Sequence, residues 1–267
     1  MIDRINSRDN ALLRQARAVR DAKIEELIFV EGLRLCEEAL RSSLEIEAVI
    51  VSEELLRKER AAGVINELSH VARRSASVSE KLLESISYTK TPQGIVVLAQ
   101  RPDGSETRVT TSLQSNSLIV VLHQINNPVN VGAILRTAEA AGATGVITTK
   151  NTSDPFSPKS LRGAMGSAFR LPIWTGPSYE DAIEWCHRHS IITVCADVEG
   201  DTNYTDLDWT KANALLVGPE STGFSQEELD QADRRVKIPM KGMAESLNVS
   251  VAAGILLFEA ARQRAPV

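Results

Sequence analysis

A glycine and an arginine stand inside a predicted helix where an ordinary core helix would have neither, in the stretch NPVNVGAILRTAEAAG at residues 127–142. Asn130 is a good N-cap and Gly142 can close the helix in a left-handed cap, so the pattern predicts a helix between them. Gly132, in the first turn, costs up to about 1 kcal/mol relative to alanine, which indicates that another backbone or a ligand comes close there. Arg136 lies one helical turn later on the same face, although a lone helical arginine is more often a plain surface residue.

Two further segments combine glycines and polar residues where a strand ends or a helix starts. In LLVGPESTGFS, residues 215–225, Gly218 and the proline after it force a turn that exposes main-chain N–H and C=O groups after a buried strand. Glu220 follows at the sheet edge, where a capping role is the ordinary alternative. In RVKIPMKGMAESLNVSVAAGI, residues 235–255, a strand ends at a proline, a flexible loop follows, and Asn248 is a plausible N-cap of the last helix. These are the positions where α/β sheets bind ligands.

Familiar cofactor signatures do not fit these segments. Residues 218–225, GPESTGFS, have the glycine spacing of a phosphate-binding P-loop, but Phe224 stands where the lysine must be. Without that cation the β- and γ-phosphates lose their main charge partner, which excludes ATP or GTP hydrolysis. No G-x-G-x-x-G follows a predicted strand, which disfavours a nicotinamide or flavin site. The cysteines and histidines within 186–195 have no zinc-site spacing, so we expect no metal and interpret them as packing residues.

The elements that must position these segments alternate between helix and strand. In the first hundred residues, helices are expected near 9–22, 32–42, 53–61 and 79–87, and strands at 27–31, 46–51 and 94–99. Together they predict a small α/β domain at 1–100. The next segment, 101–116, is polar, contains Pro-Asp-Gly and has no sustained apolar period, so it is predicted to be a linker.

Past the linker, continuous apolar runs predict strands that are covered on both faces. These runs lie at 117–123, 145–149, 191–198 and 213–218, and helical patterns lie at 131–141, 179–189, 226–232 and 248–264. The alternation predicts a second α/β domain, at 117–267, with a mainly parallel sheet.

Composition limits the class of protein. With 267 residues, 43% of them hydrophobic, the chain can bury a large core, and two modest domains fit its length. We expect no membrane segment, because no apolar stretch approaches the ~18 residues of a membrane span. We expect a cytoplasmic protein, because the first residues lack the apolar centre of a signal peptide and the three scattered cysteines form no disulfide framework. The net charge of −5 argues against nonspecific coating of nucleic acid, so any nucleic-acid surface must be local. Basic residues gather in 1–23 and 150–170, although each group alone could equally be a solvated face.

The three chemical segments, taken together, point to one family. NPVNVGAILRTAEAAG, LLVGPESTGFS and IPMKGMAESLNVSVAAGI, in this order and spacing, resemble the three motifs of the SpoU (TrmH-like) RNA ribose 2′-O-methyltransferases of the SPOUT superfamily. The resemblance covers about 117–264. The first hundred residues resemble the small substrate-binding domain that many members carry, at SRDNALLRQARAVRD, FVEGLRLCEEAL and SVSEKLLESISYTKTPQGIVVLA.

This resemblance implies an α/β architecture in which a SPOUT-type trefoil-knotted parallel-sheet domain follows a small RNA-binding domain. It implies S-adenosylmethionine (AdoMet) as cofactor and a homodimer in which the partner can help to complete the active site. The reaction would be AdoMet-dependent 2′-O-methylation of a ribose in structured RNA, most of all 23S-type ribosomal RNA. The alternatives are a tRNA 2′-O-methyltransferase and a non-catalytic RNA-binding protein of the same fold.

The resemblance also assigns residues. Arg136 matches the catalytic arginine, and because a guanidinium hardly loses its proton in proteins we assign it to steadying the developing alkoxide and orienting a phosphate. The residues that would hold Arg136, ribose and cofactor in register are Asn130, Glu220, Ser246 and Asn248. The cofactor cleft maps mostly onto main chain, at Leu216, Val217, Gly218, Glu220, Ile238, Met240, Leu247 and Asn248.

RNA contacts are expected from the two basic groups. They comprise Arg8, Arg14 and Arg17 in the first domain, and Lys159, Arg162 and Arg170 in a segment at 151–173 that resembles the family's loop near the incoming nucleotide. Phe156 and Phe169 in that segment could stack on bases, although core packing is the commoner role. His123 stands where relatives often have an acidic residue, a departure that bears on RNA fit rather than on reaction type.

Overall fold

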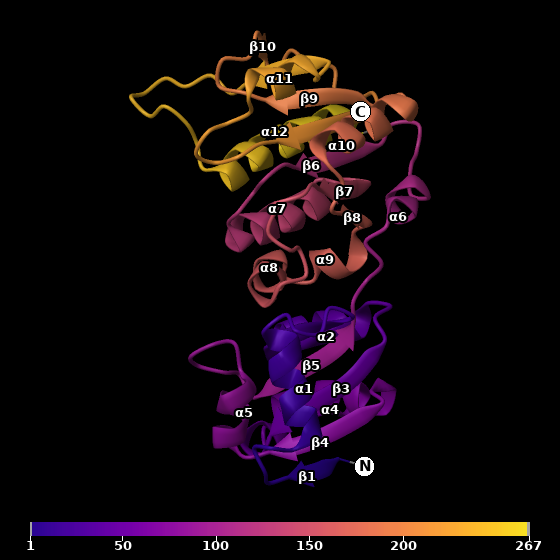
Figure 1. The fold of residues 1–267 in the computed structure, drawn as a ribbon, viewed down its shortest axis with the longest axis vertical. Helices are drawn as coiled ribbons and strands as arrows, with labels where there is room; N and C mark the ends of the chain where they lie inside the picture. Colours follow the sequence, from indigo (N-terminus) through magenta and orange to yellow (C-terminus); the bar gives the residue numbers. More distant parts are fainter. Residues whose placement is uncertain (1, 266–267) are drawn as a thin grey trace. The chain divides into compact units, whose positions relative to one another are not determined.

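The computed structural model describes residues 2–265 and divides into two compact units (Figure 1). The first unit comprises Met1–Pro102 and Phe156–Arg170, and the second comprises Asp103–Pro155 and Leu171–Val267. The chain therefore passes between the units three times, after residues 102, 155 and 170.

The first unit is built on a five-stranded mixed sheet. Its strand order is β1 (Asp3–Ile5), β4 (Arg74–Val78), β3 (Ile46–Ser52), β5 (Ile95–Gln100) and β2 (Leu27–Glu31). The first three strands run parallel, and β5 is antiparallel to both β3 and β2. The sequence missed β1 and β4, because β1 has three residues with two exposed and β4 begins Arg-Ser, so neither presents an apolar run.

Helices cover this sheet. They are α1 (Ala11–Arg20), α2 (Leu33–Arg41), α3 (Glu53–Leu56), α4 (Glu59–Val71) and α5 (Glu80–Ile86). The single helix expected at 53–61 is wrong: Lys58 leaves helical geometry, with φ −90° and ψ 111°, and splits the segment into α3 and α4. One face of α1 is apolar, with Leu12, Leu13, Ala16 and Val19 buried, and packs with α5 on the sheet.

Residues 156–170 belong to the first unit although the sequence places them in the second domain. They form α8 (Pro158–Ala164) and α9 (Ser167–Arg170), and α8 packs against β2. The Arg170 Nη1 atom lies 2.5 Å from Glu38 Oε2 on α2. Gly166 has φ +96°, and an added Cβ would lie 2.7 Å from Glu38 Oε2, so this turn fits closely only as glycine.

The second unit is built on a seven-stranded sheet, and all of its strand pairs are parallel, as the sequence predicts. The order is β10 (Thr202–Asn203), β12 (Arg234–Lys237), β9 (Ile192–Ala196), β11 (Asn213–Val217), β6 (Leu118–Leu122), β7 (Gly145–Thr148) and β8 (Ile173–Thr175). Strands β6, β7 and β11 are buried along their whole length, which explains their continuous apolar runs.

The helices of this unit are α6 (Glu106–Thr110), α7 (Pro128–Ala140), α10 (Tyr179–Arg188), α11 (Gln226–Asp230) and α12 (Val249–Arg264). Helix α6 lies within the segment predicted as linker, and its Val109 is fully buried in the core that α10 forms with the sheet. Helices α7 and α12 pack against each other, magenta against yellow in Figure 1.

Helix α7 begins earlier than its sequence pattern indicates. Asn127, not Asn130, is the N-cap: its side chain accepts a hydrogen bond from the Val129 N–H at 3.0 Å. Pro128 takes the first helical position, where its fixed φ suits the helix and its missing N–H costs nothing. The predicted capping role of Asn130 is therefore wrong, and its side chain is free for another task.

Candidate functional site

A cavity of about 740 Å³ opens at the carboxyl ends of β9, β11 and β12 in the second unit. Three segments line it: residues 196–199 after β9, residues 217–226 after β11, and a stretch between Arg235 and Val249 after β12. One side of α12 closes it, through Ala252, Ala253 and Leu256. This is the edge of a parallel sheet at which α/β proteins bind ligands.

The loop after β11 folds back over its own first residue. A Cβ on Gly218 would lie 2.5 Å from the Phe224 ring, so the loop can take this path only with glycine at 218. The main-chain N–H groups of Gly218, Ile238 and Leu247 make no hydrogen bond within residues 2–265, and all three residues line the cavity. The cavity thus offers unused main-chain donors to a ligand.

A buried histidine ties this loop to the sheet. His123, directly after β6, has Nδ1 3.0 Å from Thr149 Oγ1 and Nε2 2.8 Å from Glu228 Oε1. The other oxygen of Glu228 accepts the Ser225 N–H at 2.7 Å, in the capping box of α11. Phe224 stacks on the His123 ring at 5.9 Å between centroids and an angle of 11°. Of these side chains, only Phe224 lines the cavity. His123, Thr149 and Glu228 support the cavity wall from behind.

The charge of Glu228 is stabilised by this arrangement. Burial opposes its ionisation, but hydrogen bonds from Ser225 and the neighbouring His123 outweigh burial and lower the pKa of the carboxyl below its usual value. This structural role of His123 was not predicted, because its two partners lie 26 and 105 positions away along the chain.

Most of the predicted cofactor residues lie together at the cavity. They are Val217, Gly218, Glu220, Ile238, Met240, Leu247 and Asn248, joined by Ser246. Leu216 does not line it: the side chain is fully buried in the core on the α10 face of the sheet. Asn248 caps α12 as predicted, since Oδ1 accepts the Ser250 N–H at 2.9 Å.

The sequence missed the acidic wall that follows β9. Asp197 and Glu199 line the cavity, and Arg235 lies beside them with Nη2 2.6 Å from Asp197 Oδ2. That carboxylate raises the pKa of Arg235 further, so the pair stays charged. The signal was the appearance of three carboxylates, Asp197, Glu199 and Asp201, directly after the apolar run of β9.

Arg136 and Asn130 lie on α7 and do not line this cavity. The Arg136 side chain is exposed and has no hydrogen bond or ion pair in the part of the chain that the structure describes. Asn130 is 6% exposed, and its Nδ2 atom has no partner among residues 2–265, although a buried amide normally has one. Gly132, between them, is buried.

The predicted RNA-contacting residues all lie in the first unit. Arg8 and Arg14 are exposed, whereas Arg17 is half-buried and donates from Nη2 to the Arg8 carbonyl at 2.9 Å. Lys159 and Arg162 are exposed on α8, one turn apart. Arg170 is committed to Glu38.

The two phenylalanines of this segment are packing residues. Phe156 and Phe169 are 2% and 3% exposed, and the Arg101 guanidinium lies 4.8 Å from the Phe156 ring centroid. Their burial leaves no open face on which a base could stack.

Other side chains with chemical potential are accounted for by packing. Cys36, Cys186 and Cys195 are buried free thiols, and burial raises the pKa of Cys186 to about 12. Within residues 2–265, no group of three or more His, Cys, Asp or Glu side chains is placed to hold a metal ion. In the same range, no helix has the length and apolar character to cross a membrane.

Comparison with known proteins agrees with this architecture. The model of the SpoU rRNA methylase family matches residues 117–258, and that of the MRM3-like substrate binding domain matches residues 11–97. The 23S rRNA (uridine(2479)-2′-O)-methyltransferase of Streptomyces viridochromogenes is 34% identical over 194 residues, which are 71% of this chain and 67% of that protein. The 23S rRNA (guanosine(2553)-2′-O)-methyltransferase of Bacillus subtilis is 29% identical over 232 residues, 86% of each chain.

A solved structure gives the same result in three dimensions. The AdoMet-bound rRNA methyltransferase of Sinorhizobium meliloti superposes with a TM-score of 0.85 at 30% identity, over 98% of each chain. The SpoU match alone covers more than half of the residues. The chain therefore belongs to the SpoU rRNA methylase family, a family of AdoMet-dependent RNA 2′-O-ribose methyltransferases.

Proposed function

We propose that this chain transfers a methyl group from AdoMet to a ribose 2′-hydroxyl of structured RNA, and that the RNA is 23S-type ribosomal RNA. The observation that carries the proposal is the cavity after β9, β11 and β12, with its three unused main-chain donors. The ribosomal choice is supported by the S. viridochromogenes and B. subtilis relatives, which are named for 23S rRNA but for different nucleotides.

The cavity fits the cofactor in size and charge. Its volume of about 740 Å³ is in the range of small-molecule sites. Four carboxylates line it, at Asp197, Glu199, Glu220 and Glu245, against one arginine already paired with Asp197. AdoMet supplies a methyl group on a positively charged sulfur, so an acidic wall suits it. We assign Gly218, Ile238 and Leu247 to main-chain contacts, with Val217, Met240 and Asn248 around them.

Methyl transfer to a hydroxyl needs alignment and charge control more than it needs a metal. The 2′-oxygen becomes negative as its proton leaves, and the Arg136 guanidinium, charged at any physiological pH, can stabilise that oxygen and hold a nearby phosphate. We propose that Asn130, Glu220, Ser246 and Asn248 keep the ribose and Arg136 in register. The unpartnered Nδ2 of Asn130 supports this role, because a buried donor needs an acceptor.

We further propose that the enzyme is a homodimer. Arg136 does not line the cavity of its own chain. An active site that combines Arg136 with the cofactor cavity therefore needs a surface from a second copy of the chain. Helix α7, which carries Arg136, and helix α12, which packs on it, expose apolar side chains: Val129 is 45% exposed, Val251 51% and Phe258 54%. Val129 and Arg136 are seven residues apart on one face of α7, and Val251 and Phe258 are seven apart on one face of α12. A second copy that covers this face would bury the stripe and complete the site.

Three further expectations from the sequence stay proposals. The first is a trefoil knot in the second unit, which is supported by the path of the chain: β12 pairs with β9 near one edge of the sheet, and α12, which follows the loop at 238–248, packs on α7 and β11. The second is the functional division into a substrate-binding domain at 1–100, a linker at 101–116 and a methyltransferase domain at 117–267. The third is a cytoplasmic location, supported by three buried free thiols.

The test is direct labelling. Total RNA from a strain that lacks the gene is incubated with the purified chain and AdoMet carrying a labelled methyl group, and alkali-resistant ribose positions are mapped. We expect label at one position of 23S rRNA. Label confined to tRNA would show that the substrate is tRNA and not 23S rRNA. A folded protein that takes up AdoMet but labels no RNA would overturn the catalytic proposal.

A further inference from the structure

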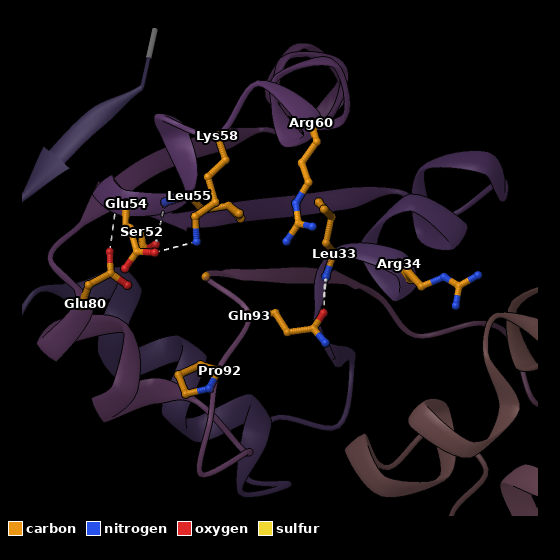
Figure 2. A pocket seen from close by; sticks show the side chains of 11 residues that line it. Leu33, Arg34, Ser52, Glu54, Leu55, Lys58, Arg60, Glu80, Pro92 and Gln93 are labelled. Carbon is orange, nitrogen blue, oxygen red and sulfur yellow. Dashed lines mark hydrogen bonds and ion pairs between the residues drawn. The ribbon is translucent and has the colours of Figure 1, made fainter.

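A second cavity lies in the first unit, about 430 Å³ in volume (Figure 2). It is formed by the start of α2, the α3–α4 region, and the loop that leads into β5. Figure 2 shows Lys58 and Arg60 reaching toward the space bounded by Leu33, Pro92 and Gln93. None of its lining residues is among those that the sequence assigned to RNA or to the cofactor.

The walls of this cavity are fixed by the fold. Gly94 has φ +87°, and a Cβ there would lie 2.8 Å from Leu55 Cβ, so the start of β5 packs directly against α3. The Gln93 Oε1 atom accepts the Leu33 N–H at 3.1 Å, which orients the amide and leaves its NH₂ group as a donor. Leu33, Leu55 and Pro92 supply an apolar surface. The cavity is thus preformed, apolar on its walls and polar at defined points.

Charge is separated across the cavity. Glu54 and Glu80 lie at one side, where Glu80 Oε1 accepts the Glu54 N–H at 2.9 Å and Lys58 Nζ lies 2.5 Å from Glu54 Oε1. In Figure 2 Arg60 reaches toward the space, whereas the Arg34 side chain extends away from it at the rim beyond Leu33; neither guanidinium has an ion pair or hydrogen bond in the described range 2–265. A bare phosphate ion is disfavoured beside two carboxylates. A ligand with an uncharged, hydrogen-bonding body and an anionic end matches both sides.

We propose that this cavity receives one unpaired nucleotide of the RNA, with the base against Leu33, Leu55 and Pro92 and the adjoining phosphate held by Arg60, with Arg34 at the rim where the RNA chain leaves the cavity. The inference rests on the proposed function, because it names the part of the RNA that the first unit holds. Carboxylate oxygens of Glu54 and Glu80 accept from base N–H groups, and the Gln93 amide donates to base oxygens or nitrogens.

The chemistry of RNA favours an unpaired nucleotide over a duplex. In an A-form helix the base faces are stacked and the deep major groove is too narrow for side chains, so no base can enter a closed pocket. A bulged or looped base is already unstacked and pays little to leave its neighbours. The match of residues 11–97 to a substrate-binding domain model agrees with an RNA contact in this unit.

The experiment measures binding of synthetic RNA to the full chain without AdoMet. The probes are four fluorescein-labelled hairpins that each carry one unpaired nucleotide, A, C, G or U, and a fully paired hairpin of the same stem. We expect at least one bulged hairpin to bind about tenfold more tightly than the paired one, the scale of a single well-made base contact. Equal affinity for all five hairpins, within twofold, would overturn the inference.

Variants locate the contact. Leu33→Trp fills the cavity without changing charge, and we expect it to abolish the preference for the bulged hairpin while binding of the paired hairpin stays the same. Arg60→Ala should weaken the bulged hairpin about tenfold and lower the salt slope by about one unit, as expected for one lost phosphate contact. Arg57→Ala is the matched control, since Arg57 is an exposed cation three residues away that does not line the cavity. An equal loss in Arg57→Ala would overturn the assignment.

Folding and function are separated in the same design. Far-ultraviolet circular dichroism and thermal unfolding report whether the first unit of each variant is folded, uptake of AdoMet reports on the other unit, and Arg60→Ala keeps the test valid if Leu33→Trp unfolds. A chain that methylates RNA yet shows no preference for bulged hairpins loses this inference and keeps the proposed function. If the chain prefers bulged hairpins but methylates no RNA, this inference is kept and the proposed function is lost.

Discussion

The two cavities are built on different principles. The larger one, in the second unit, is lined by loops whose main chain offers donors at Gly218, Ile238 and Leu247. The smaller one, in the first unit, depends on side-chain charges at Arg34, Arg60, Glu54 and Glu80. A site made of main-chain groups tolerates many side-chain substitutions but not a change in the backbone path. In a site made of side-chain charges, each truncation of a charged side chain removes part of the binding affinity.

Arg136 provides the sharpest test of this contrast, because the proposed chemistry depends on one side chain outside both cavities. Arg136→Ala should lower the rate of methyl transfer by about 100- to 1000-fold, the scale of losing one group that stabilises a developing oxyanion. AdoMet affinity should stay unchanged, because Arg136 does not line the cavity. The measurements are single-turnover transfer to RNA and calorimetry with AdoMet. Near-normal turnover would remove the catalytic role.

Phe258→Asp tests whether the α7–α12 face is an interface. Phe258 is 54% exposed, and a carboxylate there would face its own copy across a two-fold axis, so we expect the dimer dissociation constant to rise about 100-fold. Val71→Asp is the matched control, because Val71 is 56% exposed in the first unit. Analytical ultracentrifugation over a concentration series checks both variants. A Phe258→Asp protein that stays dimeric at the wild-type concentration contradicts the assignment.

Gly218→Ala tests the main-chain character of the larger cavity. The new methyl group would lie 2.5 Å from the Phe224 ring, so the loop must shift, and we expect AdoMet affinity to fall about tenfold. Gly242→Ala adds the same methyl group in open space and should leave affinity within twofold. Calorimetry on both variants decides. Equal affinities for the two would show that the loop path does not govern the site.

Glu228→Gln has the smallest expected effect and depends on pH. The folded-state pKa of Glu228 is lowered from 4.5, so its contribution to stability is present above pH 4.5 and is lost as pH falls through the folded value. At pH 7 the variant should be less stable by about 1–2 kcal/mol, the worth of hydrogen bonds to a charged group. The difference in free energy of unfolding between wild type and variant should disappear as the pH falls below 4.5. Urea unfolding at several pH values measures it, with exposed Glu227→Gln as control; a gap independent of pH refutes the role of the charge.

The sequence predicted those elements whose physics is local. Strands β6, β7, β9 and β11 each present an apolar run, and Asn248 caps α12 as its position indicates. The start of α7 was misplaced because two asparagines, Asn127 and Asn130, both suit a cap, and the proline at the first helical position decided between them. The polar strands β1 and β4 pair with the sheet through long-range contacts that no short pattern records.

The larger cavity was predicted from the sequence and the smaller one was not. Main-chain donors leave no side-chain signature, so Gly218, Ile238 and Leu247 were found through family resemblance rather than through chemistry. Arg34 and Arg60 were missed because each is an ordinary cation in the first turn of a helix, with no motif around it. Only the fold brings residues 33–34, 54–60 and 92–94 around one space.

The return of residues 156–170 to the first unit limits how this protein can be dissected. A fragment cut at 117 would keep Arg170 and Phe156 but discard Glu38 and Arg101, the groups they contact. Chimeras that exchange the amino-terminal half between relatives would therefore need to carry the α8–α9 insert with it, as one discontinuous cassette.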